Sequence, residues 1–61
     1  MLSPEAAQDS LRRRGFRHID FVGRDGRDGD VYRYKADDPN GHDVKVAVNA
    51  HNGQIIDVQR R

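Results

Sequence analysis

Cysteine and tryptophan are absent from this 61-residue chain, and proline occurs only twice. Without cysteine there is no disulfide framework and no cysteine-based zinc site. That absence fits the cytosol and the bacterial periplasm equally. No apolar run approaches the roughly 20 residues that a membrane-spanning helix needs, and the chain carries no recognisable signal peptide. We therefore expect a single domain over residues 1–61 with no segment inserted into a membrane.

A surplus of charge of either sign is also missing. The chain has 11 basic and 10 acidic side chains, for a net charge of +1. A general nucleic-acid-binding protein usually carries a clearly basic face, so this balance argues against one. Hydrophobic residues make up 34% of the chain. Because so small a domain buries only about 60% of the surface of its unfolded chain, we expect a thin core.

Residues 4–14 have the pattern of one helix. Ser3 is a good N-cap and is followed by proline at the first helical position. Gly15 is placed for the left-handed conformation that commonly ends a helix. These signals predict that the helix begins and ends within this segment.

Alternating apolar and polar residues, bounded by glycine, aspartate or asparagine, predict four strands. Their ranges are about 17–22, 30–36, 43–49 and 55–59. Together with the helix they predict an α+β domain, in which one N-terminal helix packs on one face of a four-stranded antiparallel meander. The expected core is Ala7, Leu11, Phe16, Ile19, Phe21, Tyr32, Tyr34, Val44, Val46, Val48, Ile56 and Val58.

The register of the last hairpin follows from keeping apolar residues on one face. A two-residue Asn-Gly turn would place a carboxylate opposite a core valine. A three-residue loop over 51–53 instead pairs Val48 with Ile56 and Val46 with Val58. The glycine of that loop then takes the left-handed conformation, as in a type I turn followed by a bulge.

The same reasoning applies to the two earlier hairpins. A three-residue loop over 39–41 has the same Asn-Gly chemistry and pairs Tyr34 with Val46. For the first hairpin, consistent faces predict that Phe21 pairs with Tyr32 across a polar, glycine-rich loop.

With this layout the chain resembles PepSY-type domains, small bacterial domains that also occur in peptidase propeptides. The helix ends in Gly15-Phe16, where the family has glycine before an aromatic residue, and "VYRYKA" is similar to its tyrosine-bearing second strand. The stretch "VKVAVNAHNGQII" is similar to the family ending V-x-V-D-x-x-T-G-x-I. Asn49 and Asn52 stand where the family has aspartate and threonine.

The resemblance implies a non-enzymatic module that binds or inhibits a protein or peptide. It implies that the module is a domain of a larger secreted or membrane-attached bacterial protein, and it suggests a periplasmic or extracellular location. A peptidase or a second copy of the chain is the implied partner. No catalytic residue transfers, and no cofactor is implied.

Successive side chains of a strand point to opposite faces of the sheet. The residues that alternate with the core set therefore lie on the face away from the helix, and they include both apolar and polar side chains. A thin domain that exposes apolar groups together usually uses them, although single surface valines need no explanation. The strand at 55–59 offers a second route to a partner, through its free edge. The residues we expect to contact a partner are Val22, Val31, Arg33, Ala47, Asn49, Ile55 and Asp57.

The sequence gives little indication of metal binding, catalysis or nucleic-acid binding. Aspartates in glycine-rich stretches are explained by turn formation, and no EF-hand spacing or nucleophile motif is present. We therefore expect no metal site and no enzymatic activity. The alternative function is nucleic-acid binding through a basic helix end, although the aromatic residues all map to the helix-covered face. Its candidate residues are Arg12, Arg13, Arg14, Arg17 and Arg24.

Overall fold

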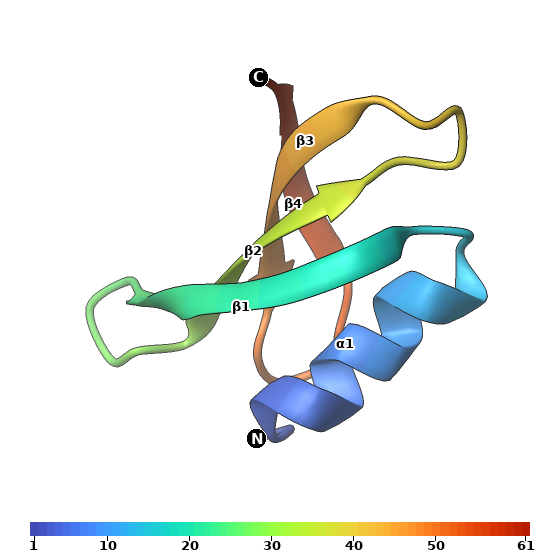
Figure 1. Ribbon diagram of the computed structural model, residues 1–61. Helices are drawn as coiled ribbons and strands as arrows, with labels where there is room; N and C mark the ends of the chain where they lie inside the picture. Colours follow the sequence, from blue (N-terminus) through green and yellow to red (C-terminus); the bar gives the residue numbers. More distant parts are fainter.

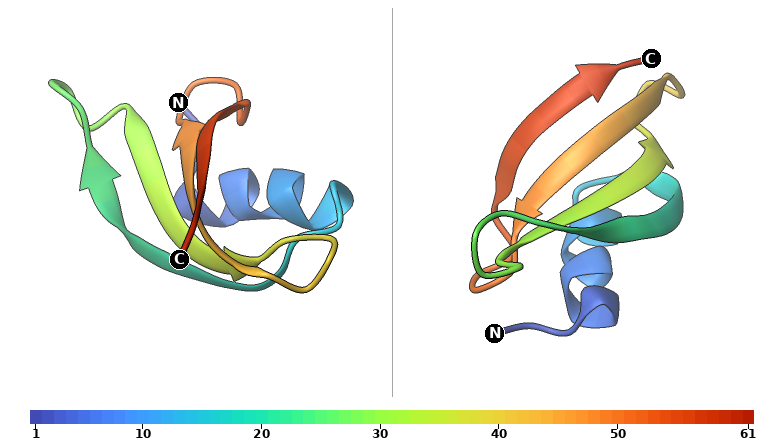
Figure 2. Two further views of the ribbon diagram at one scale, coloured as in Figure 1. Left: turned by 90° about the horizontal axis from the view of Figure 1, so that it is seen from above. Right: turned by 90° about the vertical axis from the view of Figure 1, so that its left-hand side faces the viewer.

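The computed structural model describes residues 1–61, which form one helix and a four-stranded sheet (Figure 1). The strands are antiparallel neighbours in the order β1-β2-β3-β4. The helix lies on one side of a strongly twisted sheet (Figure 2). The predicted α+β architecture with a meander sheet is therefore confirmed. The elements are α1 (Pro4–Arg13), β1 (Arg17–Asp25), β2 (Val31–Asp37), β3 (Asp43–Asn49) and β4 (Ile55–Arg60).

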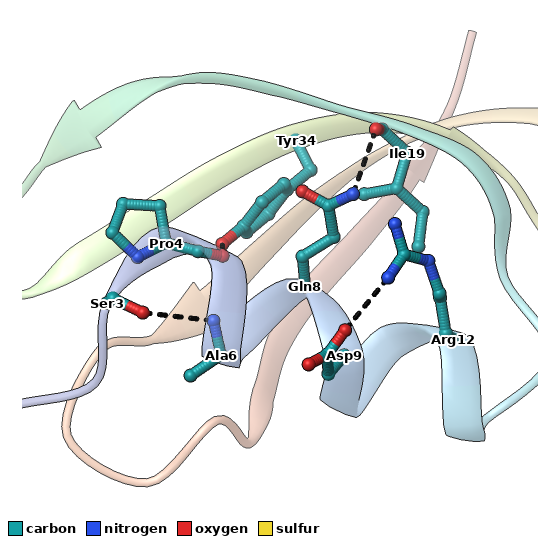
Figure 3. Close-up of polar contacts among 8 residues, drawn as sticks. All are labelled: Ser3, Pro4, Ala6, Gln8, Asp9, Arg12, Ile19 and Tyr34. Carbon is teal, nitrogen blue, oxygen red and sulfur yellow. Dashed lines mark hydrogen bonds and ion pairs between the residues drawn. The ribbon is translucent and has the colours of Figure 1, made fainter.

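Helix α1 is closed at both ends by local hydrogen bonds. Ser3 Oγ accepts a bond from the Ala6 N–H at 3.1 Å (Figure 3). After the helix, the N–H of Gly15, with φ at +93°, donates to the Arg12 carbonyl. The next N–H, that of Phe16, donates to the Leu11 carbonyl. These two bonds make a Schellman motif, which brings Phe16 into the core beside the end of the helix.

The core lies between α1 and the centre of the sheet. Tyr32 and Tyr34 are its largest members, and their hydroxyls donate to the carbonyls of Leu2 at 2.6 Å and Pro4 at 2.7 Å. Figure 3 shows the Tyr34 ring reaching the start of α1. Both hydroxyls are thus satisfied where burial would otherwise be costly. The buried apolar residues are Ala7, Leu11, Phe16, Tyr32, Tyr34, Ala36, Val44, Val46, Ala47, Val48 and Ala50.

The β2–β3 hairpin has the predicted register. The Asp38 N–H donates to the His42 carbonyl at 2.8 Å, and the Gly41 N–H donates to the Asp38 carbonyl at 2.9 Å. Gly41 has a φ of +84°. Tyr34 lies directly opposite Val46, as predicted from the Asn-Gly turn and the alternation of apolar residues.

The β3–β4 turn is one residue longer than predicted. The Asn49 N–H donates to the Gln54 carbonyl and the Gly53 N–H to the Asn49 carbonyl, both at 2.8 Å, so the loop spans residues 50–53. Gly53 has the predicted positive φ, at +75°. The predicted three-residue loop over 51–53, in which Ala50 would pair with Gln54, is therefore wrong.

Ala50 cannot pair with Gln54 because remote segments use both of its backbone groups. Its N–H donates to the Asp30 carbonyl at 2.8 Å, and its carbonyl accepts from the Leu2 N–H at 2.7 Å. The side chain of Ala50 is fully buried. The turn is thus hydrogen-bonded to the N-terminal segment and to the β1–β2 loop.

A bulge in β4 absorbs the extra loop residue. Val48 lies opposite Ile55, and the ladder resumes with Ala47 opposite Asp57, which leaves Ile56 without a partner. The prediction that Ile56 pairs with Val48 in the core is wrong: Ile56 is 56% exposed. The predicted pairing of Val58 with Val46 is confirmed.

Strand β1 carries two bulges and is longer than predicted. The first includes His18, whose φ is +52°, and the second leaves Val22 outside the ladder. As a result Phe21 lies opposite Tyr34, and the predicted pairing with Tyr32 is wrong. Its ring still packs edge-on against both tyrosines, with centroids 5.5 and 5.7 Å apart, so Phe21 faces the helix side as expected.

The helix covers only the middle of the sheet. Phe21 on β1 and Val58 on β4 lie on the helix side, yet each is 41% exposed. Both were predicted to be core residues, and that prediction is wrong. Ile19 is partly buried against the core. One ten-residue helix cannot cover four twisted strands, so the two outer strands keep apolar side chains in contact with solvent.

Candidate functional site

The sheet face away from α1, which we call the open face, is arranged in rows across the strands. Residues directly opposite each other in an antiparallel ladder point to the same side. One row is therefore Asp20, Lys35, Lys45 and Gln59, the next is Gly23, Arg33, Ala47 and Asp57, and a third contains Asp25, Val31 and Asn49.

The structure brings six of the seven predicted contact residues together on this face. Arg33, Ala47 and Asp57 are consecutive members of one row, and Val31 lies opposite Asn49 in the next. The sixth, at the second β1 bulge, is Val22, which lines the same surface and is 58% exposed. Ala47 is 5% exposed and contributes little surface of its own.

Ile55 does not belong to this surface. It lies opposite Val48 and packs against the core on the helix side. The prediction that it shares the open face is wrong, because the bulge at Ile56 reverses the parity of the strand at that point. The apolar patch expected on the open face is correspondingly smaller.

A shallow hollow of about 210 Å³ lies on the open face. Lys35 and Lys45, the only lysines of the protein, stand directly opposite each other in its lining. Neither makes an ion pair, and Asp20 lies opposite Lys35 without forming one. Like charges directly opposite in a sheet are destabilising. The lining comprises Val22, Arg33, Tyr34, Lys35, Lys45, Val46 and Gln59.

Arg33, the third basic group at the hollow, is already neutralised. Its Nε lies 2.7 Å from Asp25 Oδ2, while Asp25 Oδ1 accepts the Gly26 N–H at 2.8 Å. The bond from Gly26 and then the Arg33 guanidinium hold the pKa of Asp25 below its ordinary value. The cations of the hollow that form no ion pair are therefore the two lysines, with Asp20 opposite Lys35 but beyond ion-pair distance.

The two lysines alternate with the core residues of their strands, which places them on the open face, but they were not among the predicted contact residues. The signal was available in the sequence. Positions 35 and 45 pair across the β2–β3 turn in the register that its Asn-Gly residues indicate, so both side chains point to the same face. Two residues of like charge at directly opposed strand positions are unfavourable in a sheet. The lysine pair could therefore have been recognised as a candidate site from the sequence alone.

Acidic groups gather at the end of the open face nearest the β2–β3 turn. Asp37 lies opposite Asp43, and His18 Nδ1 lies 2.8 Å from Asp37 Oδ2. Hydrogen bonding with His18 first, and with Asp43 second, lowers the pKa of Asp37. No three histidine, cysteine, aspartate or glutamate side chains converge here or elsewhere in a way that could hold a metal ion.

The arginines of the alternative hypothesis do not form one surface. Arg12 and Arg17 line an open depression of about 380 Å³ at the end of α1, where Arg12 also pairs with Asp9 at 2.8 Å. Arg24 lies near the opposite end of β1, with its guanidinium 5.4 Å from the centroid of the Tyr32 ring. The phenylalanine and tyrosine rings all lie on the helix side of the sheet, so none of them is available on the open face for base stacking.

No protein-family model matches the chain, and neither the curated proteins nor the solved structures include a match. The single helix falls short of the length and apolar character that a membrane crossing requires. The geometry of the open face and the sequence resemblance are therefore the grounds on which a function can be proposed.

Proposed function

We propose that this chain is a small non-enzymatic module of PepSY type that binds an acidic segment of a protein or peptide partner on its open face. The observation that carries the proposal is the directly opposed lysine pair in the hollow, neither member of which forms an ion pair with a carboxylate. The resemblance adds that the module is a domain of a larger secreted or membrane-attached bacterial protein, with a peptidase as one class of partner.

Binding of a carboxylate would offset an unfavourable interaction between two charges of the free protein. In the free protein the ammonium groups of Lys35 and Lys45 repel each other across the β2–β3 ladder. A carboxylate from a partner, placed between them, would add two attractions that outweigh this repulsion. At about 4 Å, each attraction has a Coulomb energy on the order of 4 kcal/mol near a protein surface before desolvation is subtracted.

The apolar part of the surface adds a second element of recognition. Val22 is 58% exposed beside the lysines. An apolar side chain next to the partner's carboxylate would cover it, at roughly 25 cal/mol per Å² of apolar surface removed from water. The favoured ligand is thus an extended segment with an acidic residue and a neighbouring apolar residue.

The test is selection of peptides from a random displayed library on the immobilised protein, followed by calorimetric titration of the selected peptides. We expect the selected sequences to combine an acidic and an apolar residue. A variant with Lys35→Gln and Lys45→Gln should bind them about tenfold more weakly, equivalent to ~1.4 kcal/mol. Equal binding by this variant would remove the hollow from consideration.

A charge-matched control uses the exposed end of α1. Arg13→Gln with Arg14→Gln removes the same charge from residues outside the hollow and should leave peptide binding unchanged. The same pair of variants addresses the nucleic-acid alternative. If the parent binds a DNA duplex with a steep dependence on salt, and the arginine variant loses that binding, the alternative is favoured.

A further inference from the structure

Strand β4 is an edge strand with a regular, unprotected outer side. All of its residues are exposed except Ile55, which is partly buried, and it carries the exposed apolar side chains Ile56 and Val58. The other edge strand, β1, is interrupted by two bulges. Bulges are a common means of blunting a sheet edge. In β4 the single bulge lies near the start of the strand, so the ladder is regular from Asp57 onward.

The outward-pointing backbone groups of β4 follow from the ladder. The Arg61 N–H donates to the Asp43 carbonyl at 3.1 Å, so residues 61, 59 and 57 direct their backbone groups toward β3. Bonded and non-bonded pairs alternate in an antiparallel ladder. Val58 and Arg60 therefore direct their N–H and C=O groups away from the sheet, where another strand could bind.

The charge pattern of β4 selects the partner strand. Asp57 lies early in the strand, Arg60 is its last residue, and Arg61 follows directly. An antiparallel strand of the same sequence brings the acidic start of each strand to the basic end of the other. A parallel copy would place like charges side by side.

We infer that the protein associates with a second copy through antiparallel pairing of the two β4 strands about a two-fold axis at Gln59. In this register Val58 of each copy pairs with Arg60 of the other through the outward backbone groups. Asp57 lies opposite Arg61 of the other copy at a non-hydrogen-bonded position, where side chains approach closely. The result is an eight-stranded sheet with a continuous open face.

Other two-fold registers are less favourable. An axis at Asp57 or Arg60 would place identical charges opposite each other. An axis at Val58 would leave Asp57 opposite the neutral Gln59 and would require the bulged Ile56 to enter the ladder. The register at Gln59 avoids both problems. The inference does not rest on the proposed function, since it uses the β4 edge and not the lysine pair.

Sedimentation equilibrium with charge-reversed variants tests the pairing. The parent's average mass should rise toward twice the monomer mass at concentrations up to about 1 mM, as expected for a small interface. Asp57→Arg alone sets two arginines against each other across the interface, and Arg61→Asp alone sets two aspartates against each other. Each variant should stay monomeric at concentrations where the parent associates. An equimolar mixture of the two restores both opposite-charge pairs and should associate again.

Circular dichroism spectra that match the parent's establish that each variant is folded, and recovery in the mixture confirms it, because a misfolded chain could not regain association. Recovery in the mixture supports the register. A parent that is monomeric throughout the concentration range overturns the inference, as does association that persists in either single variant or fails to return in the mixture. A monomeric parent that still binds the selected peptides would leave the proposed function intact.

Discussion

At the scale of single residues, two glycines provide a matched pair. Gly41 and Gly53 both have positive φ, but a Cβ on Gly41 would meet open space, whereas one on Gly53 would lie 3.3 Å from Leu2 Cδ1. Gly41→Ala should lower the free energy of unfolding by about 1 kcal/mol, the cost of the backbone conformation. Gly53→Ala should cost on the order of 1 kcal/mol more, because the new Cβ would also crowd Ser10 Cβ of α1, 3.4 Å away. Urea unfolding measures both, and equal losses would show that the β3–β4 turn is not packed tightly on α1.

The lysine pair gives a second residue-level prediction, with the opposite sign. Lys45→Gln removes repulsion from Lys35 and should raise the free energy of unfolding by up to about 0.5 kcal/mol at low salt. Added salt should reduce the gain, because screening weakens interactions between exposed charges. The measurement is urea unfolding at two ionic strengths. A variant less stable than the parent at low salt would mean that Lys45 has a favourable partner in the free protein.

At the scale of elements, Leu11 is the side chain that joins α1 to the sheet. It is fully buried, and Leu11→Ala should lower the free energy of unfolding by roughly 2–4 kcal/mol. Ile56→Ala is the control, because Ile56 is also a large apolar residue but is exposed outside the β4 ladder. It should cost less than about 1 kcal/mol. Thermal melts followed by circular dichroism compare the two, and similar losses would contradict the assignment of the core.

The same elements show where sequence reasoning succeeds. The helix ends, the β2–β3 register and the positive φ of Gly53 depend on local chemistry, namely a capping serine and Asn-Gly turns. Such features are contained within a few consecutive residues. They were therefore predictable, as was the placement of Arg33 and Asp57 on one face, which follows from parity within regular strands.

Errors arose where distant segments decide local geometry. The four-residue β3–β4 loop exists because Ala50 bonds to Asp30 and Leu2, which no local pattern reveals. The resulting bulge moved Ile55 to the helix side and Ile56 into solvent. Phe21 was wrongly predicted to be buried for a different reason. The alternation along a strand gives the face on which a side chain lies, but not whether a short helix extends far enough to cover that side chain.

At the scale of the whole molecule, stability should fall in alkaline solution because of Tyr34. Burial raises the pKa of Tyr34 from 10.0 to about 12. Between these values the unfolded chain loses the phenolic proton while the folded protein keeps it. The folded state then binds more protons, so the free energy of unfolding decreases as pH rises from 10 to 12.

Tyr34→Phe isolates this contribution. The variant loses the bond to the Pro4 carbonyl and should be about 0.5–1.5 kcal/mol less stable than the parent at neutral pH. The difference between the two proteins should narrow between pH 10 and 12, since only the parent carries this ionisable group. Urea unfolding at several pH values provides the measurement. A constant difference across this range would show that Tyr34 titrates alike in both states.

The hydrogen bonds at Ala50 also determine which amides report on global opening. Leu2 donates to Ala50 and Ala50 donates to Asp30, so three segments that are far apart in the chain meet at one point. Contacts between such distant segments are costly to close, and we expect them to break only when the chain opens as a whole. The amide proton of Leu2 should then exchange with solvent as slowly as the amide protons of the central strands, although amide protons near a chain terminus usually exchange fastest.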